Sequence, residues 1–170
     1  MYLRLALLAL VLPSLACTSS YPGDNATPDP QVSKEVLVAS VDSAMHAYLT
    51  ALTNLDAEGV IGHYANDPEF LGYMDGVPVD YATQSANVRA LFGGLESIAL
   101  DPVDVVVTPL GSDVAIASFT FSEVLTDTAG VATPLKGAVS WVWRHNGAGW
   151  AMIHVHAVHY PLDVAETPNG

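Results

Sequence analysis

The sequence predicts an α+β fold, in which helices come first and an antiparallel sheet follows. Apolar residues recur every three or four positions from Ser33 to Leu52 and again from Tyr81 to Leu95, as in amphipathic helices. From Ser97 onward the apolar residues alternate with a period of two, as in strands. Helices followed by a run of strands indicate a domain whose helices lie on one face of an antiparallel sheet.

Each helix has a recognisable start or stop. The first begins at Ser33 and presents an apolar face, and a second, shorter helix begins at Asp56, which is typical of a residue that caps a helix N-terminus. Gly93-Gly94 predicts the end of the third helix. The apolar faces comprise Val38, Val41, Met45, Tyr48, Leu49 and Leu52, then Val60, Ile61 and Tyr64, then Val88, Leu91 and Phe92.

The strands are separated by turn residues. Asp75-Gly76 between two short apolar runs predicts an early hairpin, and four longer strands are expected at about 98–109, 113–126, 134–145 and 149–160. In the last hairpin, a loop at 146–149 would place Trp143 opposite Met152, Trp141 opposite His154 and Val139 opposite His156. Neither face of this hairpin is polar, so we expect a homodimer formed through the sheet.

The N-terminus predicts export. Arg4, the apolar run 5–12 and small residues before Cys17 resemble the signal peptide of a bacterial lipoprotein, although Ser14 departs from that pattern. We therefore divide the chain into a signal peptide (1–16), an acylated Cys17 with a flexible tether (17–32), one domain (33–161) and a tail (162–170). The expected location is the bacterial periplasm or cell surface, with the lipid on Cys17 holding the protein to the membrane. The alternatives are ordinary secretion after cleavage behind Ala16 and retention of the apolar run as an anchor.

Charge and cysteine content exclude some functions. The chain has 18 acidic and 5 basic residues and a formal net charge of −13. So few cations cannot neutralise a phosphate backbone, which makes nucleic acid an unsuitable partner. Cys17 is the only cysteine, so no disulfide can form within the chain.

Several motifs resemble the SnoaL-like branch of the nuclear transport factor 2-like superfamily. They are Leu55–Gly59, His63-Tyr64, Asp67–Phe70, Gly76, and the closing pattern Val142-Trp143, Trp150 and Ile153–His156, which is similar to the association domain of calcium/calmodulin-dependent protein kinase II. The resemblance covers about residues 33–161. It implies a cone-shaped barrel in which a curved, mostly antiparallel sheet cups three N-terminal helices around a pocket, and commonly a dimer through the sheet.

Departures from the family indicate the kind of ligand. Alignment with the kinase association domain puts Trp141, Thr120 and Ala157 where its pocket has arginines, so the resemblance implies a pocket for a neutral or apolar molecule rather than an anion. Asp75 is interpreted as a turn residue. Glu123 is the one acidic residue that we consider as a pocket-facing side chain.

The candidate site residues are aromatic or histidine. His154 and His156 point the same way on a strand, close enough to share a metal ion whose third ligand would be His63, His46 or Glu123. Either histidine is also a candidate catalytic acid or base. His159 is expected on the other face unless a bulge intervenes. Packing is the alternative role for these side chains, and we predict neither a metal nor a cofactor. The candidate ligand-binding residues are Tyr48, Tyr64, Tyr73, Trp141, His154 and His156.

Three functions follow from these observations. The first is a lipid-anchored domain that binds a small neutral or apolar molecule in the cone. The second is an enzyme of the SnoaL or isomerase type that uses His154 or His156 as the general acid or base. The third is an oligomerisation module with a vestigial pocket.

Overall fold

The computed structural model describes residues 33–161, and the predicted fold class is confirmed. The predicted signal peptide (1–16), Cys17 with its tether (17–32) and the tail (162–170) lie outside the described residues. The elements in chain order are α1 (Lys34–Thr53), α2 (Ala57–Gly62), β1 (Leu71–Met74), β2 (Val77–Val79), α3 (Tyr81–Gly93), β3 (Leu95–Pro109), β4 (Val114–Asp127), β5 (Ala132–His145) and β6 (Trp150–Pro161).

The helices begin where side chains cap them. The Ser33 hydroxyl accepts a hydrogen bond from the Val36 amide at 3.3 Å, and Asp56 accepts one from the Gly59 amide at 2.9 Å. Asp80, which we had not singled out, caps α3 through the Thr83 amide at 2.7 Å. Each cap satisfies an amide that the helix itself leaves unpaired.

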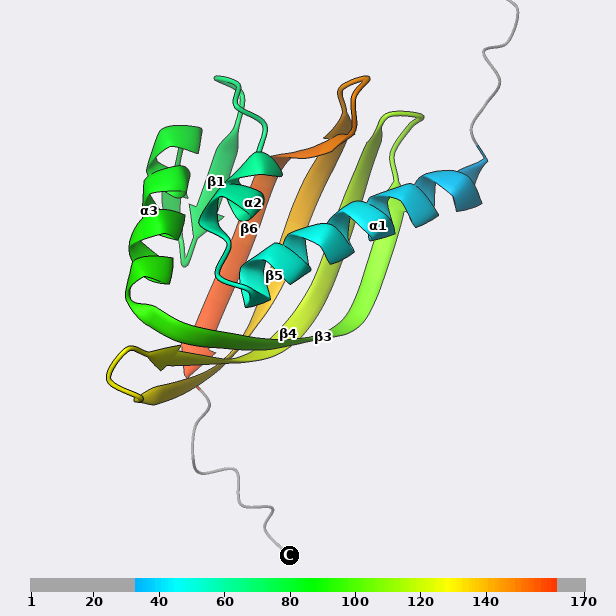
Figure 1. Ribbon diagram of the computed structural model, residues 1–170. Helices are drawn as coiled ribbons and strands as arrows, with labels where there is room; N and C mark the ends of the chain where they lie inside the picture. Colours follow the sequence, from blue (N-terminus) through cyan, green and yellow to red (C-terminus); the bar gives the residue numbers. More distant parts are fainter. Residues whose placement is uncertain (1–32, 162–170) are drawn as a thin grey trace, which may run out of the picture. The chain divides into compact units, whose positions relative to one another are not determined.

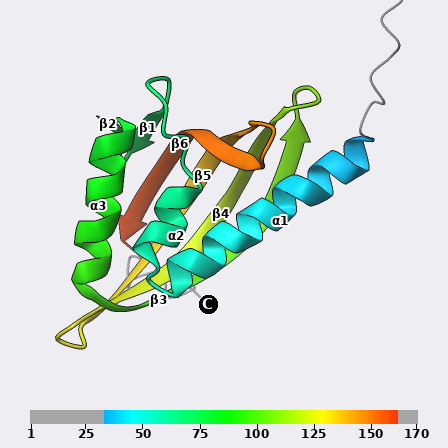
Figure 2. The ribbon, with the colours of Figure 1, turned by 45° about the horizontal axis from the view of Figure 1, so that its top comes forward.

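A single six-stranded sheet has the order β2-β1-β6-β5-β4-β3. The three helices lie on one of its faces, with α1 crossing in front of β5, β4 and β3 (Figures 1 and 2). All neighbouring strands are antiparallel except β1 and β6, which pair in parallel. The early hairpin therefore joins the last strand, a long-range pairing that the local sequence pattern did not predict.

The core lies between α1 and the inner face of the sheet. Leu37, Val41 and Met45 of α1 are buried against it, and Trp143 and Met152 are fully buried at its centre. Among the described residues, α1 is long and apolar enough to cross a bilayer by length and composition alone. Its packing in this core identifies it as a core helix.

The predicted register of the last hairpin is wrong beyond Met152. The Trp143–Met152 pair forms as expected, but the next pair joins Val142 to His154, because Ile153 adds one residue to β6. Trp141 thus lies opposite Val155 rather than His154, and Val139 opposite Ala157 rather than His156. A one-residue bulge exchanges the two faces for the rest of the strand.

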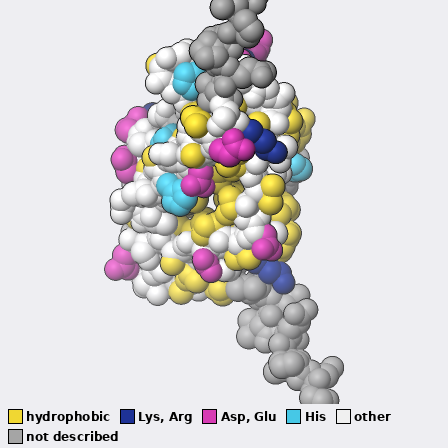
Figure 3. All heavy atoms as spheres, turned by 90° about the vertical axis from the view of Figure 1, so that its right-hand side faces the viewer, with side chains coloured by type: hydrophobic (Ala, Val, Ile, Leu, Met, Phe, Trp, Pro, Cys, Tyr) yellow, Lys and Arg dark blue, Asp and Glu magenta, His cyan; other side chains and the backbone are white. Residues whose placement is uncertain are grey.

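The outer face of the sheet carries exposed apolar side chains. Val106 of β3 is 57% exposed, and Val124 of β4 and Val158 of β6 are each 37% exposed. Figure 3 looks at the molecule from the side of α1 and β3 and shows hydrophobic side chains gathered at the surface among scattered acidic ones. The homodimer through the sheet stays a prediction, which the mass of the protein in solution would test.

Candidate functional site

Beside the core, a cavity of about 310 Å³ lies between the helices and the inner face of the sheet. Its wall combines α1 and α3 with the four long strands and the turn after β1. Apolar side chains make up most of this wall, namely Leu49, Leu52, Met74, Val88, Leu91, Phe92, Ile98, Leu100, Phe119, Phe121, Leu125, Leu135, Val139, Trp141, Val155 and Ala157. The cavity suits a small molecule that is largely apolar.

Asp75, His159 and Glu123 form one polar part of the wall, here called the acid–imidazole cluster. Asp75 lies in the turn after β1 with a positive φ of 53°, and its carboxylate accepts hydrogen bonds from the His159 backbone amide at 2.6 Å and Nδ1 at 3.0 Å. His159 Nε2 lies 3.7 Å from Glu123 Oε1. Because an ionised carboxylate only accepts, the Asp75 contact places the ring proton on Nδ1 and leaves Nε2 free to accept.

Glu123 is the most deeply buried carboxyl group of this cluster. Its exposure is 8%, whereas the side chain of Asp75 is 54% exposed. Burial raises the pKa of Glu123 above its ordinary value; a proton on both nitrogens of His159 would oppose the rise, and the charge of Asp75 adds to it. A carboxyl group with a raised pKa carries a proton over a wider pH range and can then donate a hydrogen bond.

Tyr48, Tyr64 and Gln84 form a second polar part, here called the tyrosine–amide network. The two tyrosine hydroxyls are 3.2 Å apart, and Gln84 Nε2 donates to the Tyr64 hydroxyl at 3.3 Å. All three side chains are buried and line the cavity. Burial raises the pKa of both tyrosines, so both hydroxyls remain protonated.

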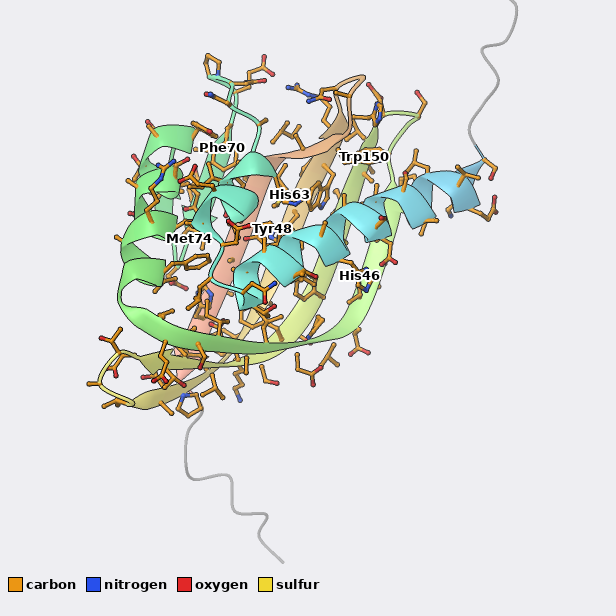
Figure 4. The ribbon with its side chains drawn as sticks, in the orientation of Figure 1. His46, Tyr48, His63, Phe70, Met74 and Trp150 are labelled. Atoms are coloured by element: carbon orange, nitrogen blue, oxygen red, sulfur yellow. The ribbon has the colours of Figure 1, made fainter. Side chains whose placement is uncertain are left out.

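Aromatic rings pack against one another beside the tyrosine–amide network. The rings of Tyr48 and Phe119 each meet the Trp141 ring edge to face, with centroids 4.9 Å apart. Figure 4 shows Tyr48 and His63 between the helices and the sheet, whereas His46 lies on the side of α1 away from them. The edge-to-face packing fixes the relative orientation of these rings in the wall.

The structure brings together half of the ligand-binding residues predicted from the sequence. Tyr48, Tyr64 and Trp141 line the cavity. His154, His156 and Tyr73 do not, because the bulge at Ile153 turns the two histidines to the outer face, where Tyr73 of β1 packs between them. The expectation that His154 or His156 acts inside the cavity is therefore corrected.

Sequence reasoning underrated three side chains of this site. His159 faces the cavity because of the same bulge, Asp75 orients it as well as forming a turn, and Gln84 belongs to a helix whose buried face was judged from apolar residues only. A signal for Gln84 existed: it is one helical turn before Val88, on the same face of α3. No local pattern reports the bulge.

Fixed cations are kept away from the cavity. Arg144 pairs with Asp67 at 2.6 Å and with Glu69 at 3.3 Å, and Arg89 pairs with Glu58 at 2.7 Å. Neither these arginines nor the two lysines of residues 33–161 contribute to the wall. Of the family's arginine positions, Trp141 and Ala157 line the cavity, whereas Thr120 is exposed on the outer face.

The acid–imidazole cluster does not have the geometry of a metal site. Asp75 and Glu123 contact opposite nitrogens of the His159 ring, so one ion cannot bind all three side chains. Across residues 33–161, no three His, Cys, Asp or Glu side chains are grouped to hold a metal ion.

Comparison with known proteins identifies the fold. No model of a protein family matches the sequence, and no curated protein matches it. Among solved structures, a nuclear transport factor 2-like superfamily protein from Salmonella enterica is 16% identical, with 81% of this chain and 99% of that chain covered and a TM-score of 0.66. A protein from Streptomyces avermitilis described as a dehydratase of the same family is 18% identical, with 77% and 99% covered and a TM-score of 0.67.

The kinase resemblance also has a structural counterpart. A Xanthomonas campestris protein described as a calcium/calmodulin-dependent protein kinase II association domain is 16% identical, with 79% of this chain and 93% of that chain covered and a TM-score of 0.63. This chain therefore has the cone-shaped fold of the nuclear transport factor 2-like superfamily, a fold that hosts several different activities.

The burial of Glu123 predicts a pH-dependent stability. Because its folded-state pKa is raised, the protonated form stabilises the fold below the unfolded pKa of about 4.3, and this contribution is lost as pH rises through the folded pKa. We expect Glu123→Gln to gain stability relative to the unmodified protein as pH rises from 4 to 8, measured by urea unfolding at each pH.

Glu58→Gln is the matched control, and its stability relative to the unmodified protein should change with pH in the opposite direction. The hydrogen bond from Arg89 lowers the pKa of Glu58, so its stabilising contribution is present above the unfolded pKa and lost as pH falls through the folded pKa. Glu58→Gln should therefore be the less stable protein at neutral pH and approach the unmodified protein in acid. Parallel pH curves for Glu123→Gln and the unmodified protein would contradict the account of Glu123.

Proposed function

We propose that this protein is an exported, lipid-anchored domain that binds a small, uncharged and largely apolar molecule in its cavity. The observation that carries the proposal is the cavity itself: an apolar wall, interrupted by a few polar groups, with the arginines paired elsewhere. An anionic ligand would lose its hydration there without gaining a cation, whereas an apolar ligand gains by leaving water.

Filling the cavity tests this proposal. Ala157 of β6 lines the cavity, and the neighbouring Val158 lies on the outer face of the same strand. We expect Ala157→Phe to weaken binding of the neutral dye Nile red at least tenfold, because the added ring occupies the ligand volume. Val158→Phe is the control and should bind the dye as the unmodified protein does. Equal binding by both variants, in a fluorescence titration, would refute the cavity as the site.

A second candidate function is acid–base catalysis on the bound molecule. The acid–imidazole cluster supports it, since Asp75 orients His159 while Glu123 lies beside the free Nε2. In this mechanism Nε2 removes a proton from a carbon next to a carbonyl group, and the neutral Glu123 carboxyl donates a hydrogen bond to the carbonyl oxygen as negative charge develops there. The proton then returns to carbon from Nε2. The dehydratase description of the Streptomyces avermitilis protein is compatible with such chemistry.

Deuterium exchange tests the second function. The unmodified protein should accelerate exchange of the protons beside the carbonyl of 4-ethylcyclohexanone in deuterated buffer, followed by NMR. His159→Gln should slow this exchange about 100-fold, the lower end of a general base contribution. His156→Gln, on the outer face, is the control with unchanged exchange. If His156→Gln loses the exchange and His159→Gln keeps it, the general base is a histidine of the outer face and not His159.

Export and anchoring rest on Cys17, which lies outside the described residues. Its place after a short apolar run and small residues supports acylation. Cys17→Ala, expressed in a bacterial host, should move from the membrane fraction to the soluble fraction and lose incorporation of a labelled fatty acid. A variant that stays in the membrane fraction would rule out the anchor.

A further inference from the structure

The tyrosine–amide network leaves one acceptor unused. Gln84 is 5% exposed, and its Oε1 is a buried side-chain oxygen without a hydrogen-bond partner among the described residues. An unsatisfied buried polar atom destabilises the folded protein, so such atoms are rare. The Gln84 residue lines the cavity, so a ligand that packs beside it could supply the missing partner.

The same network also leaves donors unused. Gln84 Nε2 donates to the Tyr64 oxygen, and the contact between Tyr64 and Tyr48 uses one of the two phenol protons. The other phenol proton has no acceptor within the network, and no hydrogen bond joins it to Oε1. The second proton of Gln84 Nε2 also has no acceptor in the network, so the three side chains hold two spare donors and one acceptor, Oε1, without a partner.

We propose that the cavity selects a ligand with a hydroxyl group, which donates to Gln84 Oε1 and accepts from the free tyrosine proton. The assignment rests on the proposed ligand-binding function and names its ligand class: a small apolar alcohol or phenol. A hydroxyl group donates and accepts through a single oxygen, so one such group can pair with Oε1 and with the free phenol proton. A ketone or an ether accepts only and leaves Oε1 unsatisfied.

The character of the remaining wall restricts the rest of the molecule. Trp141, Phe119 and Tyr48 present aromatic surface beside the network, and the nearby Val88 and Leu49 are aliphatic. The raised pKa of Tyr48 and Tyr64 keeps both as neutral donors, so the site gains nothing from an ionised ligand. A ring that carries the hydroxyl group combines both requirements.

Three probes of nearly the same shape separate the outcomes. 4-Ethylphenol donates and accepts, 4-ethylanisole accepts only, and 4-ethyltoluene does neither. Isothermal titration of the full chain should show the phenol binding about tenfold or more tightly than either of the others. Equal affinities would overturn the hydroxyl assignment and leave the apolar cavity intact. Binding of none of the three would overturn both proposals.

Substitution of Gln84 checks the residue assignment. Gln84→Met keeps the length of the side chain and removes its hydrogen-bonding atoms, so the phenol should fall to the affinity of the toluene, whose own affinity changes little. Unfolding should be hardly affected, since the replaced group includes an unsatisfied atom. Ser85→Ala, the removal of a buried polar group on the same helix, should leave the preference for the phenol unchanged.

Two results would contradict this residue assignment. One is a Gln84→Met protein that still prefers the phenol tenfold. The other is a Gln84→Met protein that binds all three probes normally but loses much of its stability, which would give Gln84 a purely structural role. If Gln84→Met fails to fold, Gln84→Leu replaces it in the same comparison. The affinities of the unmodified protein for the three probes test the hydroxyl assignment without any variant.

Discussion

The extra residue in β6 decides which side chains of the last strand reach the cavity. Ile153 separates Met152, which pairs with Trp143, from His154, which pairs with Val142. Without this bulge, His154 and His156 would face the helices and His159 would face outward. With it, Val155, Ala157 and His159 line the cavity, and the imidazole of His159 meets Asp75 from the turn after β1. The position of the catalytic candidate thus depends on one inserted residue.

Most of the fold could be predicted from periodicity, because periodicity reports burial directly. The first helix, the capping role of Asp56, the hairpin at Asp75 and the four long strands all agree with the structure to within a few residues. The parallel pairing of β1 with β6 could not be predicted, since it joins segments about 80 residues apart and is set by tertiary packing.

The site was predicted less well than the fold, for a related reason. Tyr48, Tyr64 and Trp141 sit on elements whose buried face the pattern defines, so their inward position could be read from the sequence. Beyond Met152 apolar residues alternate with histidines, and because histidine is found on either face of a sheet, this alternation does not show which set faces inward or where the bulge lies. His159 and its partner Glu123 were therefore separated in the prediction, although they face each other in the structure.

Among residues 33–161, two buried side-chain polar atoms lack hydrogen-bond partners, and their surroundings distinguish them. Trp143 Nε1 belongs to a fully buried ring that does not line the cavity, so no ligand has access to it, and the packing of the large indole in the core offsets the lost hydrogen bond. Gln84 lines the cavity, and its Nε2 donates to Tyr64 while its Oε1 has no partner. Leucine or methionine would avoid the unsatisfied oxygen but lose the bond to Tyr64, so the amide orders the tyrosine network and the proposed hydroxyl ligand would complete it.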